Sequence, residues 1–523
     1  MKNMCLFWLT MLATLASLRS ANAQVTALAE RDSKKQDGWL YERSESTPVT
    51  TVVREVAIHL QPAARPALKI RLLPDEFEVR EGNAALFYLK AGGFFEQSAV
   101  RNRFYEIHRA ASASAEKSNV EVQNVPPNSY LSTAPKDLPI EEVRKYINLL
   151  DFQTFFLEEA WRLRSFSMDR NIRQFASPIT YLLPEIQAMR ELARNQSIRC
   201  RLAIAEGRMQ DAVRILGQQF AFARHLGNDD FYVSALVGFA IPQVACNDAL
   251  YLVEHKDAPN LYWALAALPN PLVELDRAHA FERQLLFEQL KPLREIDATP
   301  RPFEYWNEFV DRLLPHLRAV KWNADTRLPS WSTDDREANR VAVITFVAAA
   351  YPGAKRYLME RTEIPHQTIE AYPTAQVSFL ALKLFYEDVR DEYFKYNFLS
   401  PAAAISANQR LTTEVDHISN RLGWSGNLAQ MFIPAMSALR VAQARMQQRI
   451  AMLQTIEAIR MYAAEHDGQL PSKLSDLPVP IPNDPLADAP LMYELQGAVA
   501  TLSGRSAGNF GYRLVLKRAV AKQ

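Results

Sequence analysis

The chain has 523 residues, and its 60 Lys and Arg residues nearly balance its 59 Asp and Glu residues. This balance argues against a nucleic-acid-binding protein and against electrostatic docking on anionic lipid, because both need a basic surface. Three cysteines are too few for a disulfide scaffold, and a chain of this length can bury a large core without one.

The first 23 residues have the pattern of a secretory signal peptide. Lys2 gives a basic start, residues 5–18 are largely apolar, and the small residues Ala21 and Ala23 precede Gln24. We therefore predict cleavage between Ala23 and Gln24, and export to the periplasm or the extracellular space. A buried N-terminal helix is the alternative.

The predicted mature chain carries almost no net charge and no clear membrane anchor. Cleavage removes Lys2 and Arg19, which leaves 58 basic residues against 59 acidic ones. No later stretch reaches the roughly 18 uninterrupted apolar residues that indicate a transmembrane helix. The longest candidate, residues 231–246, contains Ser234 and Pro242. We expect it to be a buried core helix, and we expect no transmembrane anchor after removal of the signal peptide.

We interpret residues 24–138 as a mixed N-terminal region and a linker. Residues 24–50 are polar and lack periodicity, which indicates a disordered lead-in. Period-two alternation then predicts two strands joined by residues 61–66. The alternating apolar positions are Val56, Ile58 and Leu60, followed by Leu68, Ile70 and Leu72. A short helix is expected over residues 83–91, and a linker or long ordered loop with four prolines over residues 111–139.

A helical body is predicted over residues 139–433. Glycine is scarce in the whole chain, at 16 of 523 residues, and good helix formers dominate this region. The predicted helices cover residues 140–150, 152–165, 184–206, 208–226, 230–254, 273–296, 303–322, 334–350, 376–396 and 401–421. Short turns such as residues 227–229 separate several of them, which favours antiparallel neighbours.

Cys200 and Cys246 are the cysteines that remain after the predicted cleavage, and both fall on predicted helices. An exported location permits a disulfide between them. Two buried free thiols are the alternative.

One predicted hairpin, at residues 200–220, resembles half of a tetratricopeptide-type repeat. Gly207 allows a tight turn after the first helix, and Ala212 lets the second helix approach closely. Thirty-four residues further on, Ile241 and Cys246 replace this Gly and Ala, so the period is not sustained. An ordinary helical hairpin is the alternative, and the pattern does not predict a repeat array.

Residues 434–523 are predicted to form a long helix and a small sheet. Apolar residues spaced by three or four positions mark one helical face over residues 434–466, and Gly468 is expected to cap its end. These apolar positions are Leu439, Ala442, Met446, Ile450, Leu453, Ile456, Ile459 and Ala463. Alternation near residues 493–501 and 512–516 predicts three strands.

The order of motifs in residues 450–502 resembles the head of a type II secretion pseudopilin. In that family a long helix meets a Gly-x-Tyr/Leu-Pro turn, a Leu-x-x-Leu step, an Asp-Pro turn and a small antiparallel sheet. The corresponding positions are Gly468 to Pro471, Leu474 and Leu477, and Asp484-Pro485. The resemblance implies a head-like fold but not a pilus subunit, because the helix lies at the far end of the chain and is not hydrophobic enough for a membrane. The layout as a whole also resembles exported bacterial helical proteins of unknown function.

The sequence contains no local signature of catalysis, a cofactor or a metal. The nine histidines are at least 24 residues apart, so no pair has the i, i+4 spacing of a helical metal site. No Gly-rich phosphate loop, dinucleotide fingerprint or nucleophile elbow is present. Asp484 and Asp488 are the candidate calcium ligands, but two carboxylates in a Pro-rich turn favour a turn without metal. We therefore predict no cofactor and no metal, and the catalytic residues stay unknown.

Three weaker candidates have competing structural explanations. The first is a cluster of acidic residues on one predicted helix: Glu387, Asp388, Asp391 and Glu392. Their mutual repulsion favours a raised carboxyl pKa and a role as general acid. The alternative is a solvent-exposed helix face without a catalytic role. Trp306 between Glu304 and Glu308 suits a sugar platform or a core anchor. Ser425 lies between two glycines in residues 423–426, without an identifiable His or Asp partner, and is expected in a loop.

We expect a mainly α fold: a helical-hairpin body, a short N-terminal β segment, and a C-terminal module of a long helix and an antiparallel sheet. The leading hypothesis for function is an exported, non-catalytic scaffold or binding protein of the cell envelope, whose partner is an envelope protein or a glycan. A helical carbohydrate-active enzyme, either a lyase or a hydrolase, is the second hypothesis. An accessory component of a secretion or pilus-like machine is the third.

Overall fold

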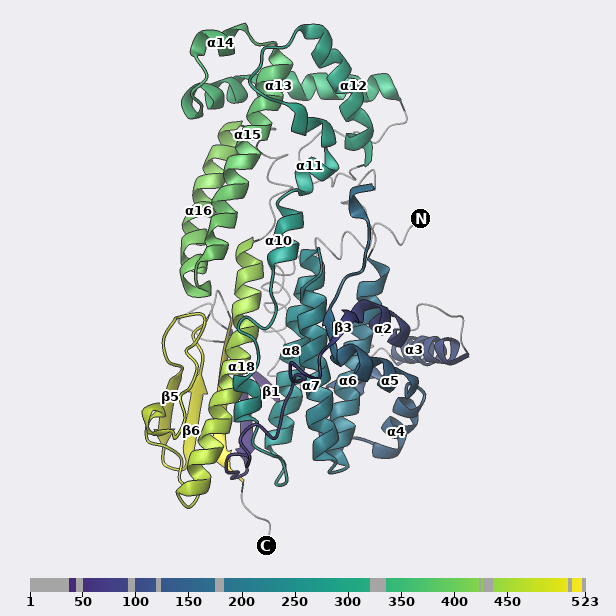
Figure 1. Ribbon diagram of the computed structural model, residues 1–523, viewed down its shortest axis with the longest axis vertical. Coiled ribbons are helices and arrows are strands. Elements are labelled where there is room, and N and C mark those ends of the chain that lie inside the picture. The colour runs from purple at the N-terminus through teal and green to yellow at the C-terminus, as the bar shows by residue number, and fades with distance from the viewer. Residues whose placement is uncertain are drawn as a thin grey trace. The chain divides into compact units, whose positions relative to one another are not determined.

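The computed structural model describes residues 37–43, 50–92, 99–118, 124–174, 183–319, 335–422, 426, 436–506 and 510–519. The predicted signal peptide, with its cleavage site at Ala23 and Gln24, lies outside the described residues, as do residues 423–425. The predicted mainly α fold is confirmed, with short N-terminal strands and a C-terminal sheet (Figure 1).

The chain divides into two compact units, which are described separately. The first unit comprises residues 1–168, 184–276 and 441–523. The second comprises residues 169–183 and 277–440.

The first unit contains the helices that border the candidate site and several others. They are α2 (Ala84–Ala91), α3 (Ala99–Lys117), α4 (Ile140–Asn148), α5 (Phe152–Trp161), α6 (Pro184–Ala205), α7 (Met209–Gly227), α8 (Tyr232–Val253), α9 (Tyr262–Ala266) and the greater part of α18 (Met436–Glu465). The helices that border the site are α6, α8 and α18. Helices α6, α7 and α8 pack side by side (Figure 1). The close approach of α7 and α8 depends on small residues, because a Cβ on Gly238 would lie 3.0 Å from the backbone of Gly227.

Helices α6 and α7 form the hairpin predicted at residues 200–220. Gly207 between them has φ +73°, a conformation that residues with a side chain rarely adopt. Ala212 is fully buried and accepts a hydrogen bond at its carbonyl from the Cys200 thiol, 3.7 Å away. The hairpin is thus closed by a tight turn and a small contact residue.

Helix α8 is long and apolar enough to cross a membrane by length and composition, but 72% of its most apolar window is buried inside the structure. The core helix of a soluble protein passes the same test. Asp248 near its C-terminal end is also fully buried, and its polar partners are described below.

One five-stranded sheet combines strands from both ends of the chain. Its order is β1 (Trp39–Arg43), β2 (Thr50–Ile58), β7 (Phe510–Arg518), β6 (Val499–Ser503) and β5 (Met492–Gln496). Strands β2 and β7 are parallel, with Val52 opposite Tyr512, and the other pairs are antiparallel. The sheet therefore joins two segments that the sequence analysis placed in separate regions.

The second predicted N-terminal strand, at residues 68–72, is wrong. Residues 59–79 contain no strand, and Leu68 is exposed while Leu72 alone of the alternating set is buried. The Leu72 carbonyl accepts a hydrogen bond from Trp161 Nε1 (3.0 Å) and lies against Gly217, so this segment packs as a loop on helices. Alternation predicts a strand only where a neighbouring strand supplies hydrogen bonds.

Other boundaries also differ from the prediction. Residues 111–117 belong to α3 instead of a linker, because Ala111 and Ala115 give it a narrow buried face one turn apart. The predicted helix at 273–296 breaks into α10 (Asp276–Glu282), α11 (Leu285–Gln289) and the 3-10 turn η6 (Lys291–Glu295). Pro292 lacks the N–H that a continuous helix would use there.

The second unit is helical in its described part. Its longer helices are α12 (Phe303–Ala319), α13 (Arg336–Arg361), α15 (Thr374–Phe394) and α16 (Pro401–Leu422), with the short α14 (His366–Ala371). Helices α13 and α15 pack together, and the rings of Trp306, Phe309 and Phe379 contact one another in the core. Helix α13 extends past the predicted end at residue 350, through Pro352, to Arg361.

Candidate ligand-binding site

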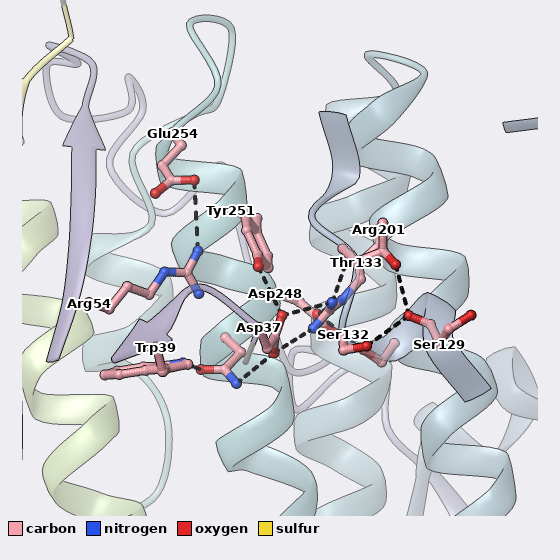
Figure 2. A network of polar contacts seen from close by, with 12 residues as sticks. Asp37, Trp39, Arg54, Ser129, Ser132, Thr133, Arg201, Asp248, Tyr251 and Glu254 are labelled. Atoms are coloured by element: carbon pink, nitrogen blue, oxygen red, sulfur yellow. Dashed lines mark hydrogen bonds and ion pairs between the residues drawn. The ribbon is translucent and has the colours of Figure 1, made fainter. Parts of the chain in front are cut away.

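The first unit contains a buried polar network centred on Arg201 of α6 (Figure 2). Its Nη1 and Nη2 atoms donate to the two carboxylate oxygens of Asp37, at 2.9 and 3.0 Å. Its Nε donates to Oδ1 of Asp248 on α8, at 2.9 Å. The side chain of Arg201 is 2% exposed, that of Asp248 is 0% exposed and that of Asp37 is 15% exposed, so one buried cation is paired with two acids.

Helix α8 supplies further donors to this network. Asn247 Nδ2 and the Tyr251 hydroxyl both donate to the Asp37 carboxylate, at 3.2 and 2.9 Å. Ser197 Oγ on α6 donates to the Asp248 carboxylate on α8 at 3.0 Å. The carboxylate of Asp37 is therefore fixed in place by groups from α6 and α8, which orients the start of β1.

Burial and charge act in opposite directions on the network. Burial raises the pKa of Asp248 to about 6, although the Arg201 cation and its hydrogen bonds act to lower it. Burial also acts to lower the pKa of Arg201, but Asp248 and Asp37 outweigh it and the pKa is raised. The guanidinium thus stays charged between its two acids.

A cavity of about 330 Å³ lies beside this network, and we call it the aromatic cavity. Trp39, Tyr41 and Tyr512 line it together with Asp37 and Arg449. The rings of Trp39 and Tyr512 meet edge to face with centroids 5.8 Å apart. Polar lining groups come from Asn128, Ser132, Arg194 and Asn247. Sites for small molecules commonly combine such apolar walls with a few polar groups.

Arg449 of α18 is the unusual residue of the aromatic cavity. It is 9% exposed, and its guanidinium carbon lies 5.0 Å from the Trp39 ring centroid and 4.8 Å from that of Tyr512. Its Nη2 donates to Asn247 Oδ1. Within the part of the chain that the structure describes, no carboxylate lies within 4.0 Å of this guanidinium. Arg449 is thus a nearly buried cation without an acidic partner among those residues.

A larger cavity, of about 760 Å³, shares Asp37 and Ser132 with the aromatic cavity. Arg54 of β2 lines it at 2% exposure, with its guanidinium carbon 4.0 Å from the Tyr251 ring centroid. Arg54 Nη2 forms an ion pair with Glu254 at 3.7 Å, and among the described residues neither terminal nitrogen of Arg54 has a hydrogen-bond partner. Burial raises the pKa of Glu254, while Arg54 acts to lower it.

The acidic cluster predicted on residues 387–392 lies on α15 in the second unit, and its members bind nearby groups. Asp391 contacts Arg283 and Arg390, Glu392 contacts Lys395, and Asp388 accepts a hydrogen bond from the Tyr357 hydroxyl. Burial, more than its acidic neighbours, raises the pKa of Glu387. The pKa of Asp391 is lowered: burial acts to raise it, but the charges and hydrogen bonds of Arg390 and Arg283 outweigh the effect of burial. The repulsion expected between the acids is thus largely offset by cations.

Three other residues singled out in the sequence, Trp306, Cys200 and Cys246, are buried. Trp306 is 2% exposed and packs on Phe309 and Phe379, while Glu304 and Glu308 are exposed. The sugar-platform hypothesis for Trp306 is therefore wrong, because its ring packs inside the core and lines neither of the two cavities described above. Cys200 and Cys246 are both buried free thiols.

The candidate calcium ligands lie in a hydrogen-bonded turn. The Asp484 side chain is buried and accepts hydrogen bonds from Gln448 Nε2 and from the backbone N–H groups of Leu486 and Arg505. Its oxygens are thus already used to hold the turn against α18. Among the described residues, no three His, Cys, Asp or Glu side chains gather in a way that would hold a metal ion.

Sequence reasoning missed the site itself. Its chemistry rests on Asp37, Arg54, Arg201, Asp248 and Arg449, which come from five separate segments. One signal was available, since Asn247 and Asp248 follow the most apolar run of the chain, and an acid on a buried helix needs a cation. The sequence does not say which cation approaches it.

No protein-family model, curated protein or solved structure matches this chain. The geometry of the two cavities is therefore the basis on which a function can be proposed.

Proposed function

We propose that this protein is an exported binding protein of the cell envelope that captures a small acidic sugar in the aromatic cavity. The observation that carries the proposal is Arg449, a nearly buried guanidinium that lines this cavity without an acidic partner among the described residues. A buried charge is costly unless it is paired, so a cation kept in this position is suited to an anion brought by a ligand.

The geometry of Arg449 favours a planar anion such as a carboxylate. The guanidinium packs against the Trp39 and Tyr512 rings, and among the described residues its only hydrogen bond runs from Nη2 to Asn247 Oδ1, so N–H groups remain for a ligand. An arginine edge matches a carboxylate with two parallel hydrogen bonds.

The cavity walls favour a sugar as the carrier of this carboxylate. The aromatic side chains of Trp39, Tyr41 and Tyr512 offer apolar surface to C–H groups of a sugar ring. Asn128, Ser132 and Asn247 are short polar groups of the kind that bind hydroxyls. Both features belong to one cavity large enough for a small ligand.

Isothermal titration of the purified protein with galacturonic acid, galactose and inorganic phosphate tests this proposal. We expect galacturonic acid to bind, and galactose, which has a hydroxymethyl group in place of the carboxylate, to bind at least about tenfold more weakly. Arg449→Gln should abolish this preference. The matched control is Arg513→Gln on β7, an exposed arginine paired with Glu42 and not part of either cavity. Equal binding of the two sugars would contradict the proposal.

A carbohydrate-active enzyme is the second candidate, and one observation favours it. The larger cavity is lined by the Asp37 carboxylate, bound by Arg201, and by Glu254, whose pKa is raised by burial. Two carboxyl groups in different environments are what an acid–base pair requires. Incubation with an acidic oligosaccharide separates the two candidates: recovery of the intact ligand supports a binding protein, whereas shorter products support an enzyme.

For residues 450–502 we propose a head-like module similar to that of a type II secretion pseudopilin. The support is the order of α18, the Asp484 turn and the antiparallel strands β5, β6 and β7. Strands β1 and β2 extend this sheet, which is an addition to the pattern implied by the resemblance. The proposal concerns the fold of the module, and the third hypothesis, a part of a secretion machine, would need a protein partner that cross-linking in intact cells can detect.

A further inference from the structure

We infer that Asn247 of α8 determines the specificity of the aromatic cavity for an anionic ligand, because its uncharged amide holds Arg449 in place without neutralising it. This inference rests on the proposed function, since it takes Arg449 as the group that binds the ligand carboxylate. Asn247 acts through Arg449 and is therefore a positioning residue.

The Asn247 side chain joins three groups of the site. Its Oδ1 atom accepts hydrogen bonds from Trp39 Nε1 (3.1 Å) and from Arg449 Nη2. Its Nδ2 atom donates to the Asp37 carboxylate at 3.2 Å. The indole and the guanidinium can only donate, and an ionised carboxylate can only accept, so the two ends of the amide cannot be exchanged. The amide thus fixes Trp39 and Arg449 relative to Asp37.

An amide suits this position better than an acid or an aliphatic group. An aspartate would accept from Trp39 and Arg449, but it would pair with the cation and would bring a second carboxylate against Asp37. An aliphatic side chain would leave the donors of Trp39 and Arg449 without this acceptor. An amide makes all three hydrogen bonds and adds no charge to the cavity.

Two neighbouring residues of α8 meet two buried arginines in different ways. Asp248 pairs with Arg201, which has a second acid in Asp37 and lines neither cavity (Figure 2). Asn247 meets Arg449, which lines the aromatic cavity and has no carboxylate within 4.0 Å among the described residues. The arginine away from the cavities is therefore paired with acids, whereas the arginine in the aromatic cavity keeps its charge for a ligand.

An acid in place of Asn247 should change what the cavity binds. Asn247→Asp puts a carboxylate where Arg449 Nη2 now has a neutral acceptor, and this carboxylate competes with that of the ligand. We expect the affinity for galacturonic acid to fall at least about tenfold, to about that for galactose. The affinity for galactose, which has no charge, should change by less than about threefold.

Isothermal titration of the wild type, Asn247→Asp and Asn247→Ala with both sugars is the test. The ratio of the two affinities is the readout, because a general structural defect weakens both sugars alike. Asn247→Ala removes the amide without adding charge, so both sugars should bind more weakly while galacturonic acid keeps at least about a fivefold preference. Asn148→Asp is the matched control, since Asn148 is exposed at the end of α4 and lines neither cavity. Circular dichroism shows whether each variant folds.

The outcomes separate this inference from the proposed function. A preference for galacturonic acid that persists in Asn247→Asp overturns the inference and leaves the proposed function standing. An equally complete loss of preference in Asn247→Asp and Asn247→Ala also overturns it, because Asn247 would then act only by orienting Arg449. If Asn247→Asp does not fold, Asn247→Ala decides: a retained preference supports the inference and a lost one overturns it. A wild type without any preference overturns both.

Discussion

The carboxylate of Asp37 and the guanidinium of Arg201 are joined by two parallel hydrogen bonds, although 164 residues separate them in the chain. This contact joins the segment before β1 to the C-terminal part of α6. The same guanidinium holds Asp248 of α8, so a single buried side chain links three elements of the first unit. The candidate site is built around this link, because Asp37 lines both cavities.

Removal of the central cation should destabilise the protein strongly. Arg201→Met leaves the carboxylates of Asp37 and Asp248 without their partner in a water-poor environment. We expect the free energy of unfolding to fall by about 3–5 kcal/mol, the usual loss when one member of a buried ion pair is removed. Urea denaturation at pH 7 measures this change. Arg513→Met, at an exposed ion pair, should change stability by less than about 1 kcal/mol.

A second substitution identifies the cause of that loss. Asp248→Asn in the Arg201→Met background removes one of the two stranded charges and should recover part of the stability. No recovery would mean that packing, and not charge, accounts for the effect of Arg201→Met.

The sequence predicts the helices of this protein better than its strands. Residues such as Leu453 and Ile456 fall on repeating buried faces, and a helix satisfies its own backbone hydrogen bonds from local sequence alone. A strand depends on a partner that is distant in sequence. Leu68 therefore has the alternation of a strand without being one, whereas β2 finds its parallel partner β7 more than 450 residues away.

The site follows from contacts that local pattern cannot encode. Arg201 and Arg449 lie on helices whose sequences resemble those of ordinary amphipathic helices, and each meets partners from other elements. An acid such as Asp248 on an apolar helix predicts that some cation is buried nearby. The identity of that cation depends on how α6 and α8 pack, which the sequence pattern does not give.

Arg449 should be dispensable for folding if its role is to bind a ligand. Arg449→Met replaces a nearly buried cation with an apolar chain of similar length beside the Trp39 and Tyr512 rings. We expect the ligand-free protein to be as stable as the wild type within about 1 kcal/mol, or more stable, because an unpaired charge is removed. Thermal unfolding without ligand measures this. A loss of more than about 2 kcal/mol would instead assign Arg449 a structural role through its ring contacts.

The thiols of Cys200 and Cys246 should be unreactive in the folded protein. Both side chains are buried, and burial raises the pKa of each thiol, so little thiolate is present at neutral pH. A maleimide reagent should label neither residue in the native protein and both after denaturation in urea. Mass spectrometry without a reducing agent measures the labels, and one disulfide in place of two labels would show that oxidation joins these cysteines.

His225 should make the protein less stable in mild acid. It is 6% exposed, its Nε2–H donates to the Leu163 carbonyl (2.8 Å), and its Nδ1 accepts from the Tyr88 hydroxyl (2.9 Å). Burial lowers the pKa of His225 to about 4, well below its ordinary value, despite the hydrogen bond to Leu163. Below about pH 6.5 the unfolded chain takes up a proton that the folded protein does not, so stability falls as pH falls from about 6.5 to about 4.

His225→Gln separates this effect from that of other groups. Glutamine can donate to Leu163 and accept from Tyr88 without titrating. Asp248 acts in the opposite direction, because its pKa is raised to about 6 and the folded protein is favoured as the pH falls through that value. It is present in both proteins and cancels in the comparison. Between pH 7.5 and 5.0 the wild type should lose about 2 kcal/mol more unfolding free energy than His225→Gln in urea denaturation. Parallel losses would show that His225 is protonated as readily in the folded protein as in the unfolded chain.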